Sequence, residues 1–453
     1  MIVLNETNLT TDQNKVIDRL YNYDETLLVA NMGAGKTVCT LTAIKELLAD
    51  GIITRVLVVA PVKVCQSVWP QEVADWSHLT GLEVADASGS NEKKRRSALD
   101  SSAPIVCINF ENLAWLFRTY GAKNMFDALV VDELTKLKNS GGTAFKALRP
   151  RLKDFKWRLG MTGTPVSENW QGLFGQMLIV DQGKRLGTRK DGYLRRYFYA
   201  TDYNEYNWAL YGWAAKAIAE KINDVVYTMP DYRHELPPLT IKPVKLPLPG
   251  VLEKHYETLL KTMAVDVDGG EVAADTAAVL SGKLMQCANG FLYPPTDPEG
   301  RREAPIILSD YKIDRCEAAV DHLLGAGEQV VICYWFDADL ERLENLYPGC
   351  KYSKANEAKF KRGGLDVLLL HPMSAGHGLN LAAGGCKMIW VGPCWSRDLF
   401  EQTIARLWRR GQKFAVDVLV LMGSDTIDEL IAARVEDKAE YEVLFKQHIG
   451  GGR

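Results

Sequence analysis

A glycine-rich turn at residues 30–37, ANMGAGKT, ends in a lysine and a threonine. Glycines let backbone N–H groups surround phosphate oxygens, lysine adds positive charge, and a threonine hydroxyl can reach Mg²⁺. The alternative is a glycine-rich turn with an exposed lysine. Because the turn lies between an apolar run and a helix-like stretch, we predict that it binds phosphate through Met32, Gly33, Ala34, Gly35, Lys36 and Thr37.

Two adjacent carboxylates end a buried run in ALVVDELTKLKN, residues 128–139. Taken alone, they could form an acidic loop that caps the next helix. Beside a phosphate loop they indicate hydrolysis. Asp132 would hold Mg²⁺ through its water shell, and Glu133 would orient and deprotonate the attacking water. Small hydroxyl residues in LGMTGTPVSENW, residues 159–170, could link this site to its surroundings, although the segment alone reads as a turn.

Arginines gather near the other end of the chain, in FEQTIARLWRRGQ at residues 400–412. A helix there would bring Gln402, Arg406, Arg409 and Arg410 close to one face. Such a run alone is more often a solvated basic face. Arginine from another lobe can also neutralise γ-phosphate charge in a transition state, which is the functional interpretation of these residues.

Short β-branched runs separated by helix-like stretches must position these groups. This alternation predicts an α/β fold with parallel sheets covered on both faces. Each run tends to end in Pro, Gly, Asp or Asn, so functional loops are expected at the carboxyl ends of the strands. The predicted strands lie in residues 26–30, 55–61, 104–110, 128–133, 329–335, 366–372, 387–393 and 415–423.

The spacing of these runs predicts two lobes. We expect the first at residues 1–235, with a helical insertion at about 180–235 that is rich in Arg, Lys, Tyr and Trp. The Pro-rich stretch at 236–250 reads as a linker. The second lobe would occupy 251–453, with a helical insertion at about 251–300.

Composition limits the function classes. A net charge of −3 over 453 residues excludes a uniformly basic nucleic-acid coat but allows local basic grooves. The nine cysteines are dispersed and never at C-x-x-C spacing, which favours reduced thiols. No secretory signal and no apolar run long enough for a membrane helix is visible. We therefore expect a cytoplasmic enzyme, in a bacterium or a phage-infected host, with no membrane partner.

The order of the motifs resembles the Swi/Snf-type DNA translocases of the superfamily-two nucleic-acid-dependent ATPases, from about Leu9 to Glu436. LTTDQNKVI resembles an adenine-reading segment with Gln13 as its glutamine, and MGAGKT, DELTKLKN and RLGMTGTP follow in the family's order. GHGLNL, the arginine segment and TIDELI complete the series. Thr135, Ala375, Trp408 and Arg410 depart from the family pattern. The chain resembles the compact form found in bacteria and their phages.

The resemblance implies two RecA-like lobes in tandem, with ATP and Mg²⁺ between them. Lys36 and Thr37 would hold phosphates and Mg²⁺, and Asp132 and Glu133 would keep the roles above. Arg406 and Arg409 would act as arginine fingers, and Gly378 of the glycine-rich motif would contribute to the nucleotide site.

Nucleic acid would lie across both lobes and be held mainly through its phosphates, because a translocase must not read sequence. Trp395, like Trp69, is more often a core residue than a base platform. His377 could equally be a solvated loop histidine. The basic segments at 91–97 and 185–196 could add contacts, although a solvated surface is the commoner role. The candidate contacts are Pro61, Lys63, Gln66, Thr162, Ser374, His377, Asn380 and Trp395.

Three functions remain open at this point. A translocase on duplex or branched DNA, which remodels complexes or anneals strands, fits best. A strand-separating DNA or RNA helicase would need a wedge element, and none is visible in the sequence. An ATP-gated clamp without turnover would not need the intact Lys36, Asp132, Glu133 and Arg409. DNA is thus the expected partner, with RNA less favoured; a replication or recombination partner is not identified, and the family leans toward a monomer.

Overall fold

A computed structural model describes residues 4–121, 125–166, 169–267, 270–274, 276–294, 303–374 and 379–433. The described residues up to Tyr232 form one compact unit, and those from Arg233 onward form another. We call them the first and second lobes. Each contains its own largely parallel sheet, so the predicted α/β class with two sheet-based lobes is confirmed.

The first lobe is built on a seven-stranded parallel sheet with the order β3-β4-β2-β5-β6-β1-β9. Every residue of β2 and β4 is buried, as expected for strands covered on both faces. The four predicted strands of this half are β1, β2, β4 and β5. The strands are β1 (Glu25–Val29), β2 (Val56–Val59), β3 (Val84–Asp86), β4 (Ile105–Ile108), β5 (Ala128–Asp132), β6 (Trp157–Thr162) and β9 (Val226–Thr228).

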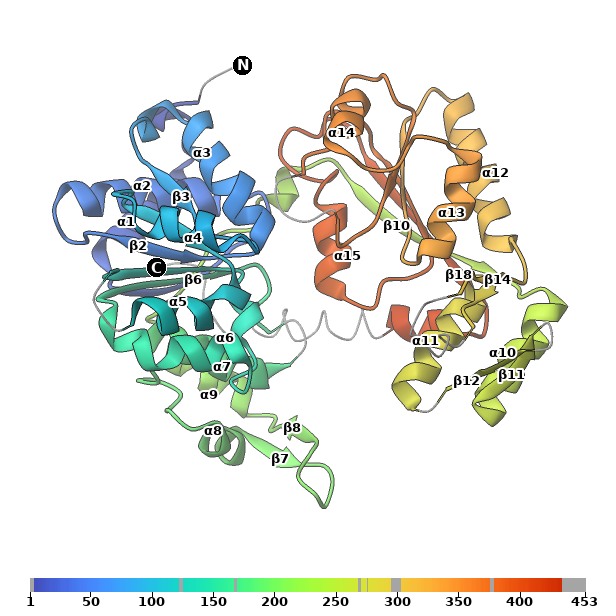
Figure 1. Cartoon of the computed structure of the whole chain (residues 1–453), viewed down its shortest axis with the longest axis horizontal. Coiled ribbons are helices and arrows are strands. Elements are labelled where there is room, and N and C mark those ends of the chain that lie inside the picture. The colour runs from blue at the N-terminus through green and yellow to red at the C-terminus, as the bar shows by residue number, and fades with distance from the viewer. Residues whose placement is uncertain are drawn as a thin grey trace. The chain divides into compact units, whose positions relative to one another are not determined.

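Helices cover both faces of this sheet (Figure 1). One face carries α1 (Thr11–Asn22), α2 (Lys36–Ala49) and α3 (Trp69–Asp75). Helices on the other face pack their apolar side chains against alternate residues of β1, β2, β4 and β5 in one continuous core. They are α5 (Leu113–Tyr120), α6 (Thr143–Leu148), α7 (Leu173–Asp181) and α9 (Ala214–Ile222), and α4 (Glu92–Leu99) adds Leu99 to the same core.

The segment at 180–235, expected to be a helical insertion, is mixed. It contains α8 (Lys190–Tyr197) and α9, but also an antiparallel pair, β7 (Phe198–Ala200) and β8 (Trp208–Leu210). Its strand β9 joins the edge of the main sheet beside β1. The β7–β8 hairpin extends beyond α8 and α9, away from the sheet (Figure 1).

The second lobe has a five-stranded parallel sheet with the order β10-β18-β17-β15-β16. Its four predicted strands are β15 (Val330–Cys333), β16 (Val367–Leu370), β17 (Lys387–Val391) and β18 (Val416–Gly423). Helices α12 (Tyr311–Gly325) and α13 (Asp337–Leu346) pack on one face. Helices α14 (Lys354–Lys361) and α15 (Arg397–Ile404) pack on the other.

The Pro-rich stretch interpreted as a linker is extended, but most of it belongs to the second lobe. Leu239–Leu246 forms β10, which pairs in parallel with β18 at the edge of the sheet. Pro243 lies within this strand, and proline is tolerated there because an edge strand leaves one side of its backbone unpaired. The unpaired connection between the two sheets is therefore shorter than the sequence indicated.

Residues 251–294 contain helices and short antiparallel strands that pack together at one end of the second lobe. They are α10 (Gly250–Thr262), β11 (Ala264–Val267), β12 (Gly270–Ala273), α11 (Ala277–Ala288) and β13 (Phe291–Leu292), which pairs with β14 (Ile306–Ile307). Among the residues that the structure describes, no helix is both long and apolar enough to cross a membrane.

Candidate functional site

The predicted phosphate loop connects the carboxyl end of β1 to the first residue of α2, Lys36. Gly33 and Gly35 have φ angles of 78° and 86°, in the left-handed region that glycine adopts without strain. A Cβ atom on Gly35 would lie 2.2 Å from Nε2 of Gln13. The loop therefore needs glycine at position 35 for both its conformation and its packing.

Lys36 folds back over this loop. Its Nζ donates to the carbonyl oxygens of Ala30 at 2.8 Å and Asn31 at 3.3 Å. These acceptors hold the ammonium within the loop, at the positive end of α2. Thr37, in the first turn of the same helix, is partly exposed.

Gln13 lies beneath the loop instead of beside an open surface. The side chain is 6% exposed, and its Nε2 donates to the carbonyl of Ala34 at 3.1 Å. Its Oε1 accepts from the backbone N–H of Thr10 at 2.8 Å, which completes a capping box at the start of α1. Both ends of the amide are engaged, so Gln13 in this conformation supports the phosphate loop.

Asp132 and Glu133 follow β5 at the same edge of the sheet. In the β5–β6–β1 register, Asp132 is opposite Met161 and Val29 is opposite Thr162, so the acidic pair and the phosphate loop flank the end of β6. Burial raises the pKa of Asp132, while the charge of Lys36 and a 3.1 Å hydrogen bond from Nε1 of Trp69 oppose that rise. The carboxylate thus faces the lysine of the phosphate loop.

Glu133 has an unusual backbone conformation. Its φ of 71° lies in the left-handed region, which costs a non-glycine residue about 1–3 kcal/mol. The Thr135 hydroxyl donates to Oε1 of Glu133 at 3.1 Å and is itself buried. Thr135 departs from the family pattern, but in this chain it orients the carboxylate assigned to water activation.

The donor set fits an ATP–Mg²⁺ complex. The loop offers an ammonium and backbone N–H groups, and Thr37 and Asp132 offer the hard oxygen ligands that Mg²⁺ prefers. Over the described ranges, no group of three or more His, Cys, Asp or Glu is arranged to hold a metal ion. Mg²⁺ in phosphate sites is usually held by one or two protein groups together with phosphate oxygens.

The arginine segment of the second lobe differs from the prediction. Helix α15 ends at Ile404, so Arg406, Arg409 and Arg410 lie in the turns that follow it and not on one helical face. The turns still bring two arginines together. Arg406 and Arg409 both direct Nη1 at the carbonyl of Leu379, at 3.5 and 3.4 Å. The predicted arginine pair therefore converges on one point beside the segment that contained the glycine-rich motif.

Gln412 was not singled out in the sequence, yet it organises these turns. Its Nε2 donates to the carbonyls of Gly385 at 2.9 Å and Leu407 at 3.2 Å. Its Oε1 accepts from the backbone N–H groups of Lys413 and Phe414. The only sequence signal was its place in the RRGQ ending of the arginine segment.

The candidate nucleic-acid contacts of the first lobe fall into two groups. Lys63 and Gln66 are exposed in the helical segment that follows β2, where Gln66 belongs to a π-helix (Val64–Val68), and Pro61 is partly exposed just before this segment. Thr162 is 1% exposed, and its Oγ1 accepts from the backbone N–H of Thr164 at 3.1 Å. It lies beneath the phosphate loop, where it cannot reach nucleic acid in this conformation.

The second lobe shows a similar division. Ser374 follows β16 in a partly exposed turn, and Asn380 is exposed just beyond. Trp395 follows β17, but its ring packs with the core of α10 and α11 and its Nε1 donates to the sulfur of Met285. This is the packing role that the sequence favoured for Trp395. His377 and Gly378 lie outside the described residues.

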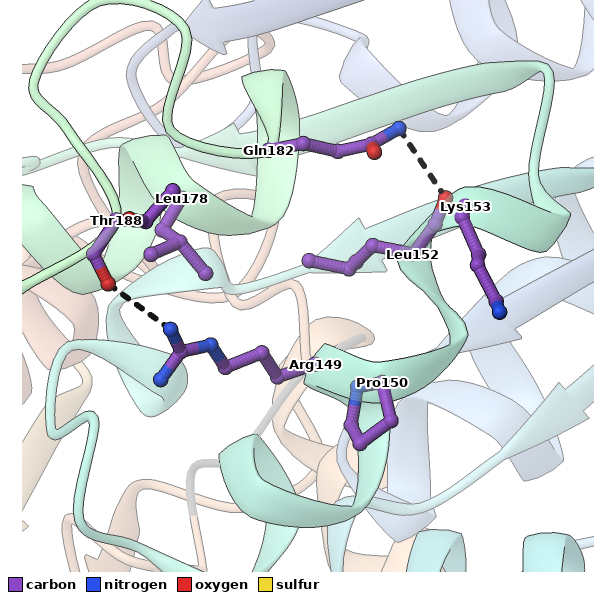
Figure 2. A pocket seen from close by; sticks show the side chains of 7 residues that line it. All are labelled: Arg149, Pro150, Leu152, Lys153, Leu178, Gln182 and Thr188. Carbon is purple, nitrogen blue, oxygen red and sulfur yellow. Dashed lines mark hydrogen bonds between the residues drawn. The ribbon is translucent and has the colours of Figure 1, made fainter.

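A pocket of about 170 Å³ lies elsewhere in the first lobe, between the turn after α6 and the loop after α7 (Figure 2). Two hydrogen bonds cross between these segments, from Arg149 to the carbonyl of Thr188 at 2.9 Å and from Gln182 to that of Leu152 at 3.4 Å. Among the residues that the structure describes, no predicted ATP-site residue lines this pocket.

Comparison with known proteins gives matches over most of the chain. The SNF2-related domain matches residues 13–289. Protein p41 of Acyrthosiphon pisum secondary endosymbiont phage 1 is 30% identical over 453 residues, which covers 96% of each chain. The DNA repair and recombination protein RAD54-like of Drosophila willistoni is 24% identical over 92% of this chain, which spans 59% of that protein.

A solved structure is also similar. It is the SWI2/SNF2 ATPase core of Sulfolobus solfataricus in complex with dsDNA, with 21% sequence identity and a TM-score of 0.45. The alignment covers 99% of this chain and 94% of that one.

Proposed function

Because this chain belongs to the family of proteins with an SNF2-related domain, we propose that it is an ATP-driven motor that translocates on double-stranded or branched DNA. It is a nucleic-acid-dependent ATPase. The observation that carries this function is the family match over residues 13–289, which includes both the phosphate loop and the Asp132–Glu133 pair. A relative named for DNA repair and recombination supports DNA as the track, on which the motor remodels, anneals or displaces.

The phosphate loop binds the triphosphate of ATP. The ammonium of Lys36 exchanges the Ala30 and Asn31 carbonyls for phosphate oxygens, and Gly33 and Gly35 turn the backbone N–H groups toward the same charge. Thr37 and Asp132 would hold Mg²⁺, which would supply positive charge to the phosphates. Because Gln13 supports Ala34, it keeps the loop in its binding conformation.

Hydrolysis requires a positioned water and stabilisation of the γ-phosphate charge. Glu133, oriented by Thr135, takes a proton from the water whose oxygen attacks the γ-phosphorus, and the bond to the β–γ bridging oxygen breaks. Arg406 and Arg409 act from the second lobe as arginine fingers, with the Leu379 carbonyl as their resting acceptor. Both lobes are therefore needed for turnover.

DNA phosphates contact exposed groups that follow strands of both sheets. In the first lobe these are Pro61, Lys63 and Gln66, and in the second they are Ser374 and Asn380, with His377 retained as a prediction. Thr162 and Trp395 are left out of this set because one is buried and the other packs in a core. The motor acts as a monomer in this proposal.

The steady-state ATPase rate tests the proposal, measured side by side with no nucleic acid, blunt duplex DNA, forked DNA, single-stranded DNA and RNA. We expect strong stimulation by duplex or forked DNA. Preference for single strands or RNA, together with unwinding of a duplex without re-annealing, would replace the translocase with a helicase. No turnover with any of these nucleic acids would leave an ATP-gated clamp.

A further inference from the structure

The β7–β8 hairpin and its flanks, residues 197–213, carry an unusual group of exposed rings. We call this segment the aromatic hairpin. Every large hydrophobic side chain that it exposes is aromatic, and none is aliphatic. Single exposed rings are common, but a group on one short projecting element marks an interaction surface (Figure 1). The exposed fractions are 45% for Tyr199, 100% for Tyr203, 82% for Tyr206, 37% for Tyr211 and 55% for Trp213.

Strand register places the rings in a row. Tyr199 is opposite Ala209, and side chains two residues apart in a strand share a face, so Tyr199 and Tyr211 form a diagonal pair with centroids 5.2 Å apart. Tyr211 and Trp213 are nearly parallel, with an interplanar angle of 14° and centroids 5.8 Å apart. The three rings thus form a partly exposed aromatic surface.

This surface is anchored in the lobe. Trp213 contacts the buried Tyr197, whose ring lies 5.3 Å from that of the buried Tyr193. Tyr193 in turn packs 5.6 Å from Phe174 and donates its hydroxyl to the carbonyl of Trp170 at 2.9 Å. A continuous chain of rings therefore runs from the core to the surface, which limits how far the exposed rings can rotate or collapse.

A guanidinium group lies beside the rings of the hairpin. Of the two arginines in the last turn of α8, Arg195 is paired with Asp191 at 3.0 Å and with Glu205 at 3.2 Å. Arg196 is the arginine beside the rings, since its guanidinium carbon lies 5.5 Å from the centroid of the Tyr197 ring. Aromatic rings next to guanidinium groups are the combination used by proteins that bind single-stranded nucleic acid.

We propose that the aromatic hairpin stacks on unpaired nucleobases at the single-stranded arms of branched DNA. The inference rests on the proposed DNA motor function and adds a substrate feature to it. Bases expose their flat faces only when they are unpaired, so this surface would distinguish a fork from a continuous duplex. An entirely aromatic set suits flat bases better than a mixed apolar patch would, because every base has a π-face to stack on.

The test compares binding of a forked DNA with binding of a blunt duplex that has the same paired length, by fluorescence anisotropy. The wild-type chain should bind the fork more tightly. Replacing both exposed stacking rings, Tyr211→Ala with Trp213→Ala, should reduce fork affinity by about 10-fold, because stacking contributes strongly for each base. The affinity for blunt duplex and the duplex-stimulated ATPase rate should stay at the wild-type level.

Ring-retaining variants and a distant ring provide the controls. Tyr211→Phe with Trp213→Phe should keep the fork preference, and Tyr23→Ala should have no effect, although Tyr23 is 50% exposed elsewhere in the first lobe. The tip variant Tyr203→Ala with Tyr206→Ala leaves the anchored row intact and should also weaken fork binding. A fork labelled with 2-aminopurine in its single-stranded arm should lose base-stacking quenching with the alanine variants.

Three outcomes would overturn the inference: wild-type fork affinity equal to blunt-duplex affinity, alanine variants that bind the fork like wild type, or equal losses on fork and duplex. A change only in self-association on gel filtration would instead assign the rings to a protein interface. The proposed motor function is tested separately, because duplex-stimulated ATPase of the wild-type chain does not depend on this hairpin.

Discussion

Glu133 shows how one residue combines strain with chemistry. Its backbone is in the left-handed region, and the Thr135 hydroxyl donates a hydrogen bond to its carboxylate. Strained conformations persist where the surrounding structure holds them, and they concentrate at functional sites. The conformational free-energy cost at Glu133 is consistent with a residue that is kept in this conformation for function, even though the conformation lowers the stability of the fold.

Glu133→Gln should separate ATP binding from turnover. The amide keeps the size of the side chain and a carbonyl oxygen for Thr135, but it cannot accept the proton of the attacking water. We expect kcat of the DNA-stimulated ATPase to fall by about 100-fold or more, with ATP and DNA affinity retained. Steady-state kinetics and nucleotide binding measure this, and wild-type turnover would refute the general-base assignment.

Trp69 packs in the core and contacts Asp132 at the edge of the sheet that carries the candidate ATP site. Its ring is fully buried, and its Nε1 donates to Oδ2 of Asp132, which opposes the rise that burial causes in the pKa of Asp132. Trp69→Phe keeps most of the packing and removes this donor. The pKa of Asp132 should then rise further, so that its carboxylate is protonated at a higher pH than in the wild-type chain.

Two measurements follow from that shift. The acidic limb of the kcat profile should move to higher pH, and the Mg²⁺ concentration for half-maximal rate should rise by about 10-fold, as for loss of a hydrogen bond to a charged group. A control, Trp115→Phe, changes a partly buried tryptophan elsewhere in the first lobe. An unchanged pH limb for Trp69→Phe would reduce Trp69 to a packing residue.

The proximity of the candidate ATP-site residues could be predicted from the sequence, but several of their contacts could not. Lys36, Asp132 and Glu133 follow strands whose ends meet at one edge, so their proximity follows from a parallel sheet. The positions of Gln13 beneath Ala34 and of Trp69 beside Asp132 depend on how helices pack over that edge. Sequence spacing holds no information about such long-range side-chain contacts.

At the scale of elements, the segment between the two sheets makes hydrogen bonds at both of its ends, at Tyr232 and at Pro237. Before it, the hydroxyl of Tyr232 donates to the carbonyl of Met32 in the phosphate loop. After it, Nε1 of Trp408 donates to the carbonyl of Pro237 at 2.8 Å, immediately before β10. In addition, Nη2 of Arg410 lies 3.8 Å from Oε2 of Glu235, which forms an ion pair. A short stretch of chain thus connects the phosphate loop with the arginine turns.

Trp408→Phe should weaken this connection without removing the aromatic ring. Loss of one neutral hydrogen bond, worth about 1 kcal/mol, would let the arginine turns sample other positions. We expect kcat of the DNA-stimulated ATPase to fall by about 5-fold with little change in KM for ATP, because Arg406 and Arg409 act in the transition state. A matching rise in KM, or no effect at all, would contradict a positioning role for Trp408.

The sequence predicts those strands whose residues are buried on both faces, because burial determines their apolar pattern. All eight predicted strands are buried runs in the two sheets, because a strand covered on both faces must be almost continuously apolar. β10 was read as a linker because an edge strand with exposed residues and a proline lacks that pattern. The arginine segment has helical spacing, but the carbonyls of Arg406 and Leu407 accept hydrogen bonds from the backbone N–H of Leu381 and the side-chain amide of Gln412, which hold the segment in turns.

For the whole molecule, a net charge of −3 must be reconciled with a polyanionic track. The proposed contact set resolves this, since it is made mainly of hydroxyl, amide and backbone groups with Lys63 as its described cation. Such contacts position a duplex without requiring an overall basic surface. They also predict a shallow dependence of DNA affinity on salt, because few counterions are released.

Two neighbouring substitutions test this reasoning in one experiment. Lys63→Ala and Gln66→Ala change exposed residues in the same helical segment after β2, but only the first removes a charge. In a plot of log affinity for duplex DNA against log salt, Lys63→Ala should reduce the slope by about 1, whereas Gln66→Ala should lower affinity and leave the slope unchanged. Equal slopes for both variants would exclude Lys63 as a phosphate contact and move the charged part of the track to another surface. Because ATPase stimulation depends on bound duplex, the salt concentration that halves stimulation should shift in parallel with these affinities.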